Sequence, residues 1–264
     1  MKIIKINESQ KNRLFEAYRE GFSFDTLSVL GGDAFSDWRD WEKQYEYCVK
    51  WLGEPDGFGS SRCVFTLSDN VILKLAMGGY RNAGVEQNRL EYEMYNRYKS
   101  PLLARVYDAD ENFTYIVCEN VVPAEDIDFE KILGIPIGNV WHQNSSKYKE
   151  PYGKGDTTVG FNKYFHDIKK PYQEYEGITL YDVFCYLESN YVVNDDDSSD
   201  SEEIEEVIDN SEWLSALRDL VEETRMSDFC NVENYGMVNR DGKPTLVILD
   251  AGMNLDLWEK HYAD

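Results

Sequence analysis

The sequence predicts an α+β fold with an N-terminal helical leader, a five-stranded-type antiparallel sheet and a reduced, mostly helical second part. Between residues 53 and 119, short runs of β-branched and aromatic residues are separated by turn residues, which is the pattern of antiparallel strands. Before and after this region, apolar residues recur at helical spacing. We therefore expect a leader over 1–52, a first lobe over 53–133 and a second lobe over 134–264.

Two helices are predicted in the leader. The first spans residues 10–21, and Asn7 or Ser9 is placed to cap its N-terminus. The second spans residues 38–52, where aromatic and apolar residues recur every three or four positions. We expect both helices to pack on the lobe that follows.

The first lobe has the predicted order strand, strand, helix, strand, strand. Turn residues at 68–70 separate the first two strands, so these strands form a hairpin. The expected bounds are 63–67 and 71–75 for the hairpin strands, 85–99 for the helix, and 103–107 and 115–119 for the last two strands.

The second lobe begins with residues that show little periodicity. Residues 134–177 are rich in Gly, Pro, Tyr and Lys and predict long loops or a tyrosine-rich insertion. An acidic, low-complexity region over 194–210 predicts an exposed loop. A helix is expected from near Ser211 to before Asp228, and a hairpin is expected over 236–249.

The charge of the chain limits the partners that it can bind. Its 264 residues carry a formal net charge of −23, which argues against binding to a nucleic-acid backbone, because that requires a positive surface. The same charge suits a basic protein partner. No apolar run approaches the roughly 18 residues of a membrane span, so we expect no membrane association.

The five cysteines are scattered along the chain, and none of them forms a C-x-x-C pair. This spacing predicts neither a zinc site nor a disulfide framework. We expect buried, reduced thiols and a cytoplasmic location.

A glycine-rich segment directly precedes the first predicted strand. It contains Gly53, Gly57, Gly59 and Ser60. Glycines let a backbone approach phosphate oxygens closely, and successive N–H groups form a cradle for an anion. A hairpin turn is the alternative explanation for these glycines.

Lys74 interrupts an otherwise apolar strand. A lysine there either leaves the edge of the sheet or enters a cleft where an anion compensates its charge. On the helix that follows, Glu91 shares a face with Met94 and Tyr95, whereas the other acidic residues lie on the polar face. One inward carboxylate soon after one inward lysine predicts that the two side chains meet.

The last predicted hairpin carries the third group of polar residues. Asp250 ends a buried strand and is followed by Ala and Gly, an arrangement that can direct a carboxylate into a metal or catalytic site. Asp228 and Asn234 lie in a loop between a helix and a strand. Asp and Asn also favour such loops for structural reasons.

Together these features resemble the protein-kinase-like fold, over roughly residues 52–254. The resemblance makes the glycine-rich hairpin the loop over the ATP phosphates, Lys74 the phosphate-contacting lysine and Glu91 its partner on the helix. It places Glu119 at the hinge, where backbone groups receive the adenine.

In the second lobe the resemblance makes Asp228 the catalytic-loop aspartate, and it makes Asn234 and Asp250 the ligands of Mg²⁺. The spacing from Asp228 to Asn234 is one residue longer than in the family, so Asn231 or Glu233 is the alternative metal-binding residue.

Other positions depart from the family pattern. Met226-Ser227 replaces the usual His-Arg, and Ala251 replaces the phenylalanine of the metal-binding element. Few residues follow that element, so we expect no activation segment and no peptide-docking helices. The sequence as a whole is similar to small kinase-like proteins encoded by bacteriophages. This resemblance would place the protein in the host cytoplasm.

The resemblance implies a Mg-ATP-binding protein that transfers phosphate to an unusual acceptor. Two alternatives belong to other classes. One is an inactive pseudokinase that binds a basic partner through its acidic surface, and the other is a nucleic-acid mimic.

Overall fold

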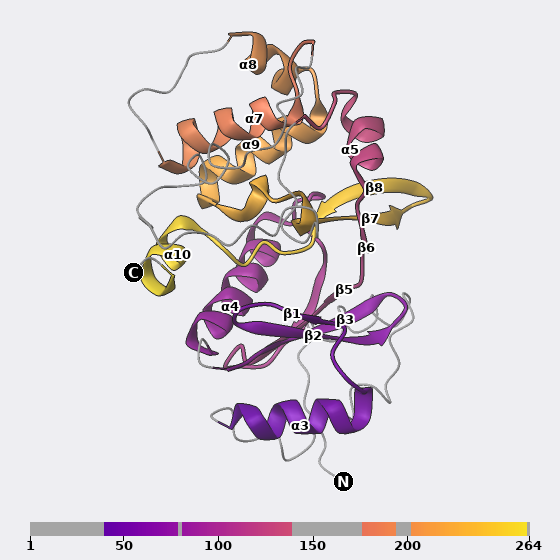
Figure 1. Cartoon of the computed structure of the whole chain (residues 1–264), viewed down its shortest axis with the longest axis vertical. Coiled ribbons are helices and arrows are strands. Elements are labelled where there is room, and N and C mark those ends of the chain that lie inside the picture. Colours follow the sequence, from indigo (N-terminus) through magenta and orange to yellow (C-terminus); the bar gives the residue numbers. More distant parts are fainter. Residues whose placement is uncertain (1–39, 79–80, 139–175, 194–201, 263–264) are drawn as a thin grey trace, which may run out of the picture. The chain divides into compact units, whose positions relative to one another are not determined.

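The computed structural model describes residues 40–78, 81–138, 176–193 and 202–262, and these form an α+β fold, as predicted (Figure 1). The described residues contain seven α-helices, one five-stranded sheet and one three-stranded sheet. Two compact units can be distinguished. The first contains the described residues of Met1–Lys99 and Ala104–Val121, and the second contains those of Ser100–Leu103 and Val122–Asp264.

Three predicted segments fall outside the described residues, wholly or in large part. They are the helix over 10–21, the insertion over 134–177 apart from its ends, and residues 194–201 of the acidic region.

The sheet of the first unit is antiparallel, with the strand order β1-β2-β3-β5-β4. Its elements are α3 (Trp41–Leu52), β1 (Gly57–Phe58), β2 (Arg62–Ser68), β3 (Val71–Ala76), α4 (Arg81–Tyr98), β4 (Val106–Ala109) and β5 (Tyr115–Glu119). β3 is therefore a central strand, paired with β2 on one side and with β5 on the other.

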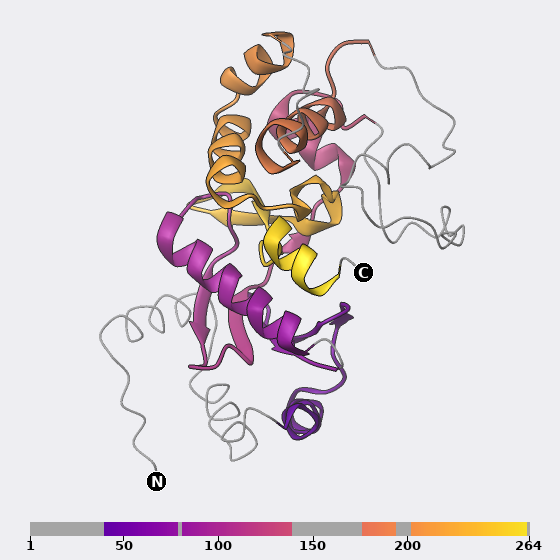
Figure 2. The same cartoon turned by 90° about the vertical axis from the view of Figure 1, so that its left-hand side faces the viewer.

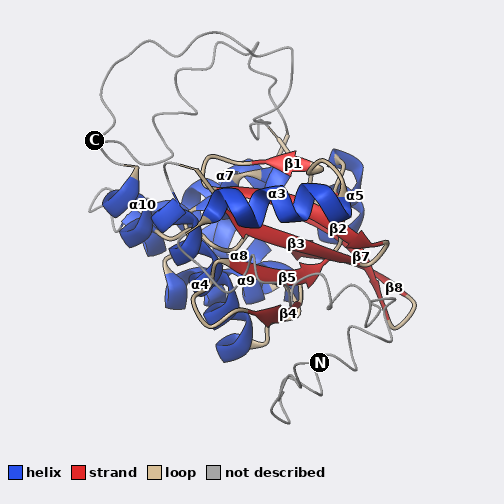
Figure 3. Ribbon diagram, turned by 90° about the horizontal axis from the view of Figure 1, so that it is seen from below, coloured by secondary structure: helices blue, strands red, loops and turns tan. Residues whose placement is uncertain are grey.

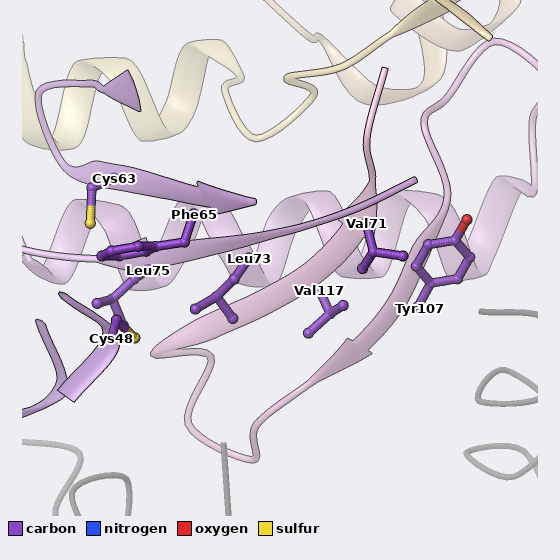
Figure 4. Close-up of a cluster of buried hydrophobic side chains, with 8 residues drawn as sticks. All are labelled: Cys48, Cys63, Phe65, Val71, Leu73, Leu75, Tyr107 and Val117. Atoms are coloured by element: carbon purple, nitrogen blue, oxygen red, sulfur yellow. The ribbon is translucent and has the colours of Figure 1, made fainter. Parts of the chain in front are cut away.

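One face of this sheet packs against α3. Asp40 caps the helix, its side chain accepting a hydrogen bond from the backbone N–H of Lys43. In Figure 3 the helix crosses in front of the first strands. The buried side chains on this face gather on one side of the strands in Figure 4; they are Cys48, Cys63, Phe65, Val71, Leu73, Leu75, Tyr107 and Val117. Alternation along β3 turns Ile72 and Lys74 to the other face.

That other face packs against α4, the long helix between β3 and β4 (Figure 2). Val106, Ile116 and Cys118 form its buried centre, and Tyr92 and Tyr95 of α4 cover them. The predicted inward face of this helix is thus confirmed, although the helix begins at Arg81 rather than at residue 85.

The strand predicted over 103–107 is wrong at its start, because β4 begins at Val106. Leu103 instead forms a parallel bridge with Ile248 in the second unit, and Leu102 accepts a hydrogen bond from the Ile248 N–H at 2.6 Å. Leu102 and Leu103 are apolar, as strand residues often are, but Leu102 lies in a turn and both belong to the second unit. The local sequence pattern does not reveal this assignment.

The second unit combines a three-stranded antiparallel sheet, β6-β7-β8, with short helices drawn partly in orange (Figures 1 and 2). Its elements are β6 (Val122–Pro123), α5 (Asp126–Leu133), α7 (Leu180–Leu187), a π-helix (Glu188–Val193), α8 (Glu202–Asp209), α9 (Glu212–Thr224), two 3₁₀ turns (Asp228–Cys230 and Val232–Asn234), β7 (Tyr235–Arg240), β8 (Lys243–Ile248) and α10 (Leu255–His261).

Aromatic side chains form the centre of this unit. Tyr235 of β7 is fully buried, stacks on Phe184 of α7 and meets Phe129 of α5 edge to face. Phe184 in turn meets Phe229 of the first 3₁₀ turn edge to face. These contacts attach the helices to the start of the β7–β8 hairpin.

The loop predicted over 194–210 is wrong for residues 202–209, which form α8. Ile208 is buried, and Ile204 and Val207 are half-buried. These three residues recur at helical spacing among acids, so the apolar period outweighs the acidic composition that suggested a loop.

We expect the free energy of unfolding to fall as the pH rises from about 9 to 12. Burial raises the pKa of Cys48 to about 12 and that of Cys63 to about 12, from an ordinary value of 9.0. In this range the unfolded chain loses both thiol protons while the native protein keeps them. Each thiol therefore lowers the free energy of unfolding by up to about 1.4 kcal/mol per pH unit.

Urea unfolding at several pH values checks this expectation in the wild type and in a Cys48→Ala/Cys63→Ala variant. The variant lacks both thiols, so its stability should decline less steeply above pH 9. If the free energy of unfolding fell equally with pH in the two proteins, the raised pKa values of Cys48 and Cys63 would be contradicted.

Candidate functional site

Lys74 and Glu91 meet in the first unit. The Lys74 Nζ lies 2.6 Å from the Glu91 Oε1, and both side chains are at least 95% buried. The edge-of-sheet alternative for Lys74 is therefore wrong. A buried ammonium and a buried carboxylate at this distance form a strong charge-assisted hydrogen bond.

Two periodicities bring this pair together. Lys74 occupies a position of β3 that alternates away from the apolar face of Val71 and Leu73, so it faces α4. Glu91 lies on the stripe of α4 that also carries the buried Met94. Strand and helix thus each contribute one charged residue to their shared interface.

Arg62 is a third member of this cluster, and it was missed from the sequence. Its Nη1 donates to the Glu91 Oε2 at 2.9 Å, and the arginine is 6% exposed. Each carboxylate oxygen of Glu91 thus holds one cation. The signal was present in the alternation of β2: Val64 pairs with Lys74, and Arg62, two residues before Val64, shares its face.

The start of β2 is attached to α4 over about one turn of the helix. The Ser61 Oγ donates to the Gln87 Oε1 at 2.8 Å, and the Arg62 Nη1 donates to the Asn88 Oδ1 at 3.2 Å. Asn88 is fully buried and its amide donates to the Phe113 carbonyl oxygen at 2.9 Å. With Glu91, these residues line one face of the helix.

Gly84 begins this face of the helix. A Cβ atom at this position would lie 2.3 Å from the Ser61 carbonyl oxygen and 3.0 Å from the Ala76 Cβ. Only glycine therefore permits this approach of α4 to the ends of β2 and β3.

The glycine-rich segment divides into two parts. Gly53 ends α3 with a φ of 92°, and its N–H donates to the Val49 carbonyl. Gly57 lies in β1, and the Gly59 N–H donates to the Arg62 carbonyl at 2.8 Å in the turn toward β2. Ser60 is exposed in the same turn.

Glu119 is the last residue of β5, and its side chain is buried. Its Oε2 accepts a hydrogen bond from the Arg105 N–H at 3.0 Å, and its own N–H donates to the Arg105 carbonyl at 2.8 Å. The carboxylate thus fixes the backbone that enters β4.

In the second unit, the residues between α9 and β7 form two successive 3₁₀ turns. The Asn234 Nδ2 donates to the Asp228 carbonyl at 3.0 Å, which holds the two turns together. The Asn231 Oδ1 accepts the Glu233 N–H at 3.1 Å and so caps the second turn. Asn231 thus has a structural role for its oxygen, whereas Asn234 is held through its nitrogen.

Asn234 and Asp250 flank the same end of the β7–β8 hairpin, because Asn234 precedes β7 and Asp250 comes after β8. Tyr235 pairs with Ile248 in the hairpin, and just beyond this pair the Leu249 N–H donates to the Asn234 carbonyl at 2.8 Å. Asp250 is half-buried, and the Gly252 N–H points to its Oδ1 at 3.4 Å. This end of the hairpin therefore carries a carboxylate and a carboxamide, which are ligand types that Mg²⁺ binds.

Among the described residues, no three His, Cys, Asp or Glu side chains are clustered as a metal site. None of the described helices combines the length and apolar composition needed to cross a bilayer. No protein-family model matches the sequence, and no curated protein matches it significantly.

We expect Gly84→Ala to destabilise the protein by about 1–3 kcal/mol, because the added methyl group clashes with the Ser61 backbone. This effect opposes the gain of about 1 kcal/mol that alanine normally brings to a helix interior. Urea unfolding measures the difference.

Asn82→Ala is the matched control, since Asn82 is exposed on the same helix. It should leave the stability unchanged or raise it slightly. A Gly84→Ala protein as stable as the wild type would show that α4 does not need this close approach.

Proposed function

We propose that the protein has a protein-kinase-like bilobal fold and binds Mg-ATP for phosphate transfer to an unusual acceptor. The observation that carries the proposal is the buried Lys74–Glu91 ion pair. It joins a central strand of an antiparallel sheet to the helix that follows that strand, as does the Lys–Glu ion pair that protein kinases require.

The first unit would supply the phosphate contacts. Glu91 holds the Lys74 side chain, so the lysine would lose less rotamer freedom on binding a phosphate. The β1–β2 hairpin would supply backbone N–H groups through Gly57, Gly59 and Ser60. In this proposal Gly53 ends α3 and does not touch the nucleotide, and the backbone beside Glu119 receives the adenine.

The second unit would supply the metal ligands. The amide oxygen of Asn234 and the carboxylate of Asp250 are the residues that would hold Mg²⁺, and the hydrogen bonds of Asn231 favour Asn234 over Asn231 for this role. Mg²⁺ neutralises phosphate charge when it is bound. Asp228 would accept the proton of the attacking hydroxyl group.

Thermal unfolding with and without Mg-ATP tests the proposed site. We expect Mg-ATP to raise the melting temperature of the wild type, because a ligand that binds only the native state stabilises it. Lys74→Met should lose most of this rise, since it removes the proposed phosphate contact. Formation of ADP in the presence of candidate acceptors then tests transfer.

Lys50→Met makes the same chemical change at an exposed position of the first unit and should respond to Mg-ATP like the wild type. If the wild type does not respond at all, or if Lys74→Met responds fully, the nucleotide-binding proposal is wrong.

The metal role has its own test. We expect Asp250→Asn to raise the Mg²⁺ concentration that ATP binding requires, because it removes the negative charge of one of the two proposed ligands. Titration of Mg²⁺ at fixed ATP, followed by thermal unfolding, compares the variant with the wild type. An unchanged Mg²⁺ concentration at the midpoint would show that Asp250 does not hold the metal.

A second candidate function is binding of a basic partner by an inactive kinase-like protein. The observation that favours it is α8, where five carboxylates are exposed: Glu202, Glu203, Glu205, Glu206 and Asp209. Binding of this kind weakens with salt and survives Lys74→Met, which distinguishes it from nucleotide binding.

A further inference from the structure

Glu91 holds two cations rather than one. Its Oε1 lies 2.6 Å from the Lys74 Nζ, and its Oε2 lies 2.9 Å from the Arg62 Nη1. All three side chains are more than nine-tenths buried. The proposed function uses the lysine and the glutamate but gives no role to the arginine.

The contacts of Arg62 restrict the orientation of the Glu91 carboxylate. A carboxylate held by one oxygen can turn about its terminal torsion, which has broad minima. With Arg62 on the second oxygen, that rotation would disturb two buried charge-assisted hydrogen bonds, because it moves both oxygens. Arg62 is itself held by the Asn88 Oδ1 at 3.2 Å.

Arg62 also belongs to the backbone that ends the glycine-rich hairpin. Its carbonyl oxygen accepts the Gly59 N–H at 2.8 Å, and the neighbouring Ser61 is attached both to the Met77 N–H and to Gln87 of α4. Arg62 thus contacts the turn of this hairpin through its backbone and Glu91 through its side chain.

We propose that Arg62 is a positioning residue for the nucleotide: it holds Glu91 in the orientation that directs Lys74, and it couples the glycine-rich hairpin to α4. This inference rests on the proposed function, because Lys74 is taken as the phosphate contact. Arg62 acts through Glu91 and makes no direct contact with phosphate.

The experiment is a double-mutant cycle on Mg-ATP affinity with Arg62→Gln, Lys74→Met and the combined variant. We expect Arg62→Gln to weaken binding about tenfold while Lys74 is present. In the Lys74→Met background the same change should have no further effect, because the group that Arg62 positions is gone. Thermal shifts at millimolar Mg-ATP extend the measurement to weak variants.

Arg62→Lys provides the rescue. It keeps the charge but replaces the planar guanidinium, whose Nη1 contacts both Glu91 and Asn88, with a compact ammonium on a shorter side chain, so its affinity should lie between those of Arg62→Gln and the wild type. If Arg62→Gln does not fold, this variant decides: binding at least about threefold weaker than wild type supports the proposal, and wild-type affinity overturns it.

Arg97→Gln is the matched control. Arg97 is exposed on α4, the helix that carries Glu91, and the variant should bind Mg-ATP like the wild type. Equal losses from Arg62→Gln in both backgrounds would make Arg62 a direct phosphate contact and overturn the positioning role. A lower melting temperature with unchanged affinity would also overturn it. A wild type that does not bind Mg-ATP would refute the proposed function itself, together with this inference.

Discussion

The first unit depends on one carboxylate. Glu91 is buried between β2, β3 and α4, where an isolated charge would be strongly unfavourable because it loses its water. Two cations, Lys74 and Arg62, make it tolerable, and each needs the carboxylate for the same reason. The strands and the helix must therefore keep a fixed relation to one another, and the close approach at Gly84 and the buried Asn88 serve the same interface.

Two of the three charged residues in this cluster could be predicted from the sequence. Lys74 and Glu91 were found because each breaks a regular apolar pattern, one of period 2 and one of helical period. Arg62 was missed because it stands between a glycine-rich turn and a strand, where a charged residue looks like part of the turn. The same limitation explains α8, where acidic composition hid a short apolar stripe, and the start of β4, where Leu103 pairs with Ile248 far along the chain.

In the second unit, the polar residues were found from the sequence, but their roles could not be separated. Asn231, Glu233 and Asn234 lie within four residues of one another, and each has a side-chain oxygen that could bind a metal. Hydrogen bonds distinguish the two asparagines: the Asn231 oxygen caps a turn, whereas Asn234 is held by its nitrogen against the Asp228 carbonyl. Such side-chain to backbone bonds depend on the local turn geometry, and that geometry follows from packing of Phe229 and Tyr235 in the aromatic centre.

The net charge of −23 and a nucleotide site of the proposed kind are compatible, because they act over different distances. At an ionic strength of 0.1 M the field of exposed carboxylates is screened within about 10 Å, whereas charges inside a buried cluster interact with little screening. A polymeric phosphate backbone follows an extended surface and binds where that surface is positive. A compact nucleotide needs only the few groups that a cluster such as Lys74, Glu91 and Arg62 fixes in place. A negative surface and a local phosphate site of the proposed kind therefore do not conflict.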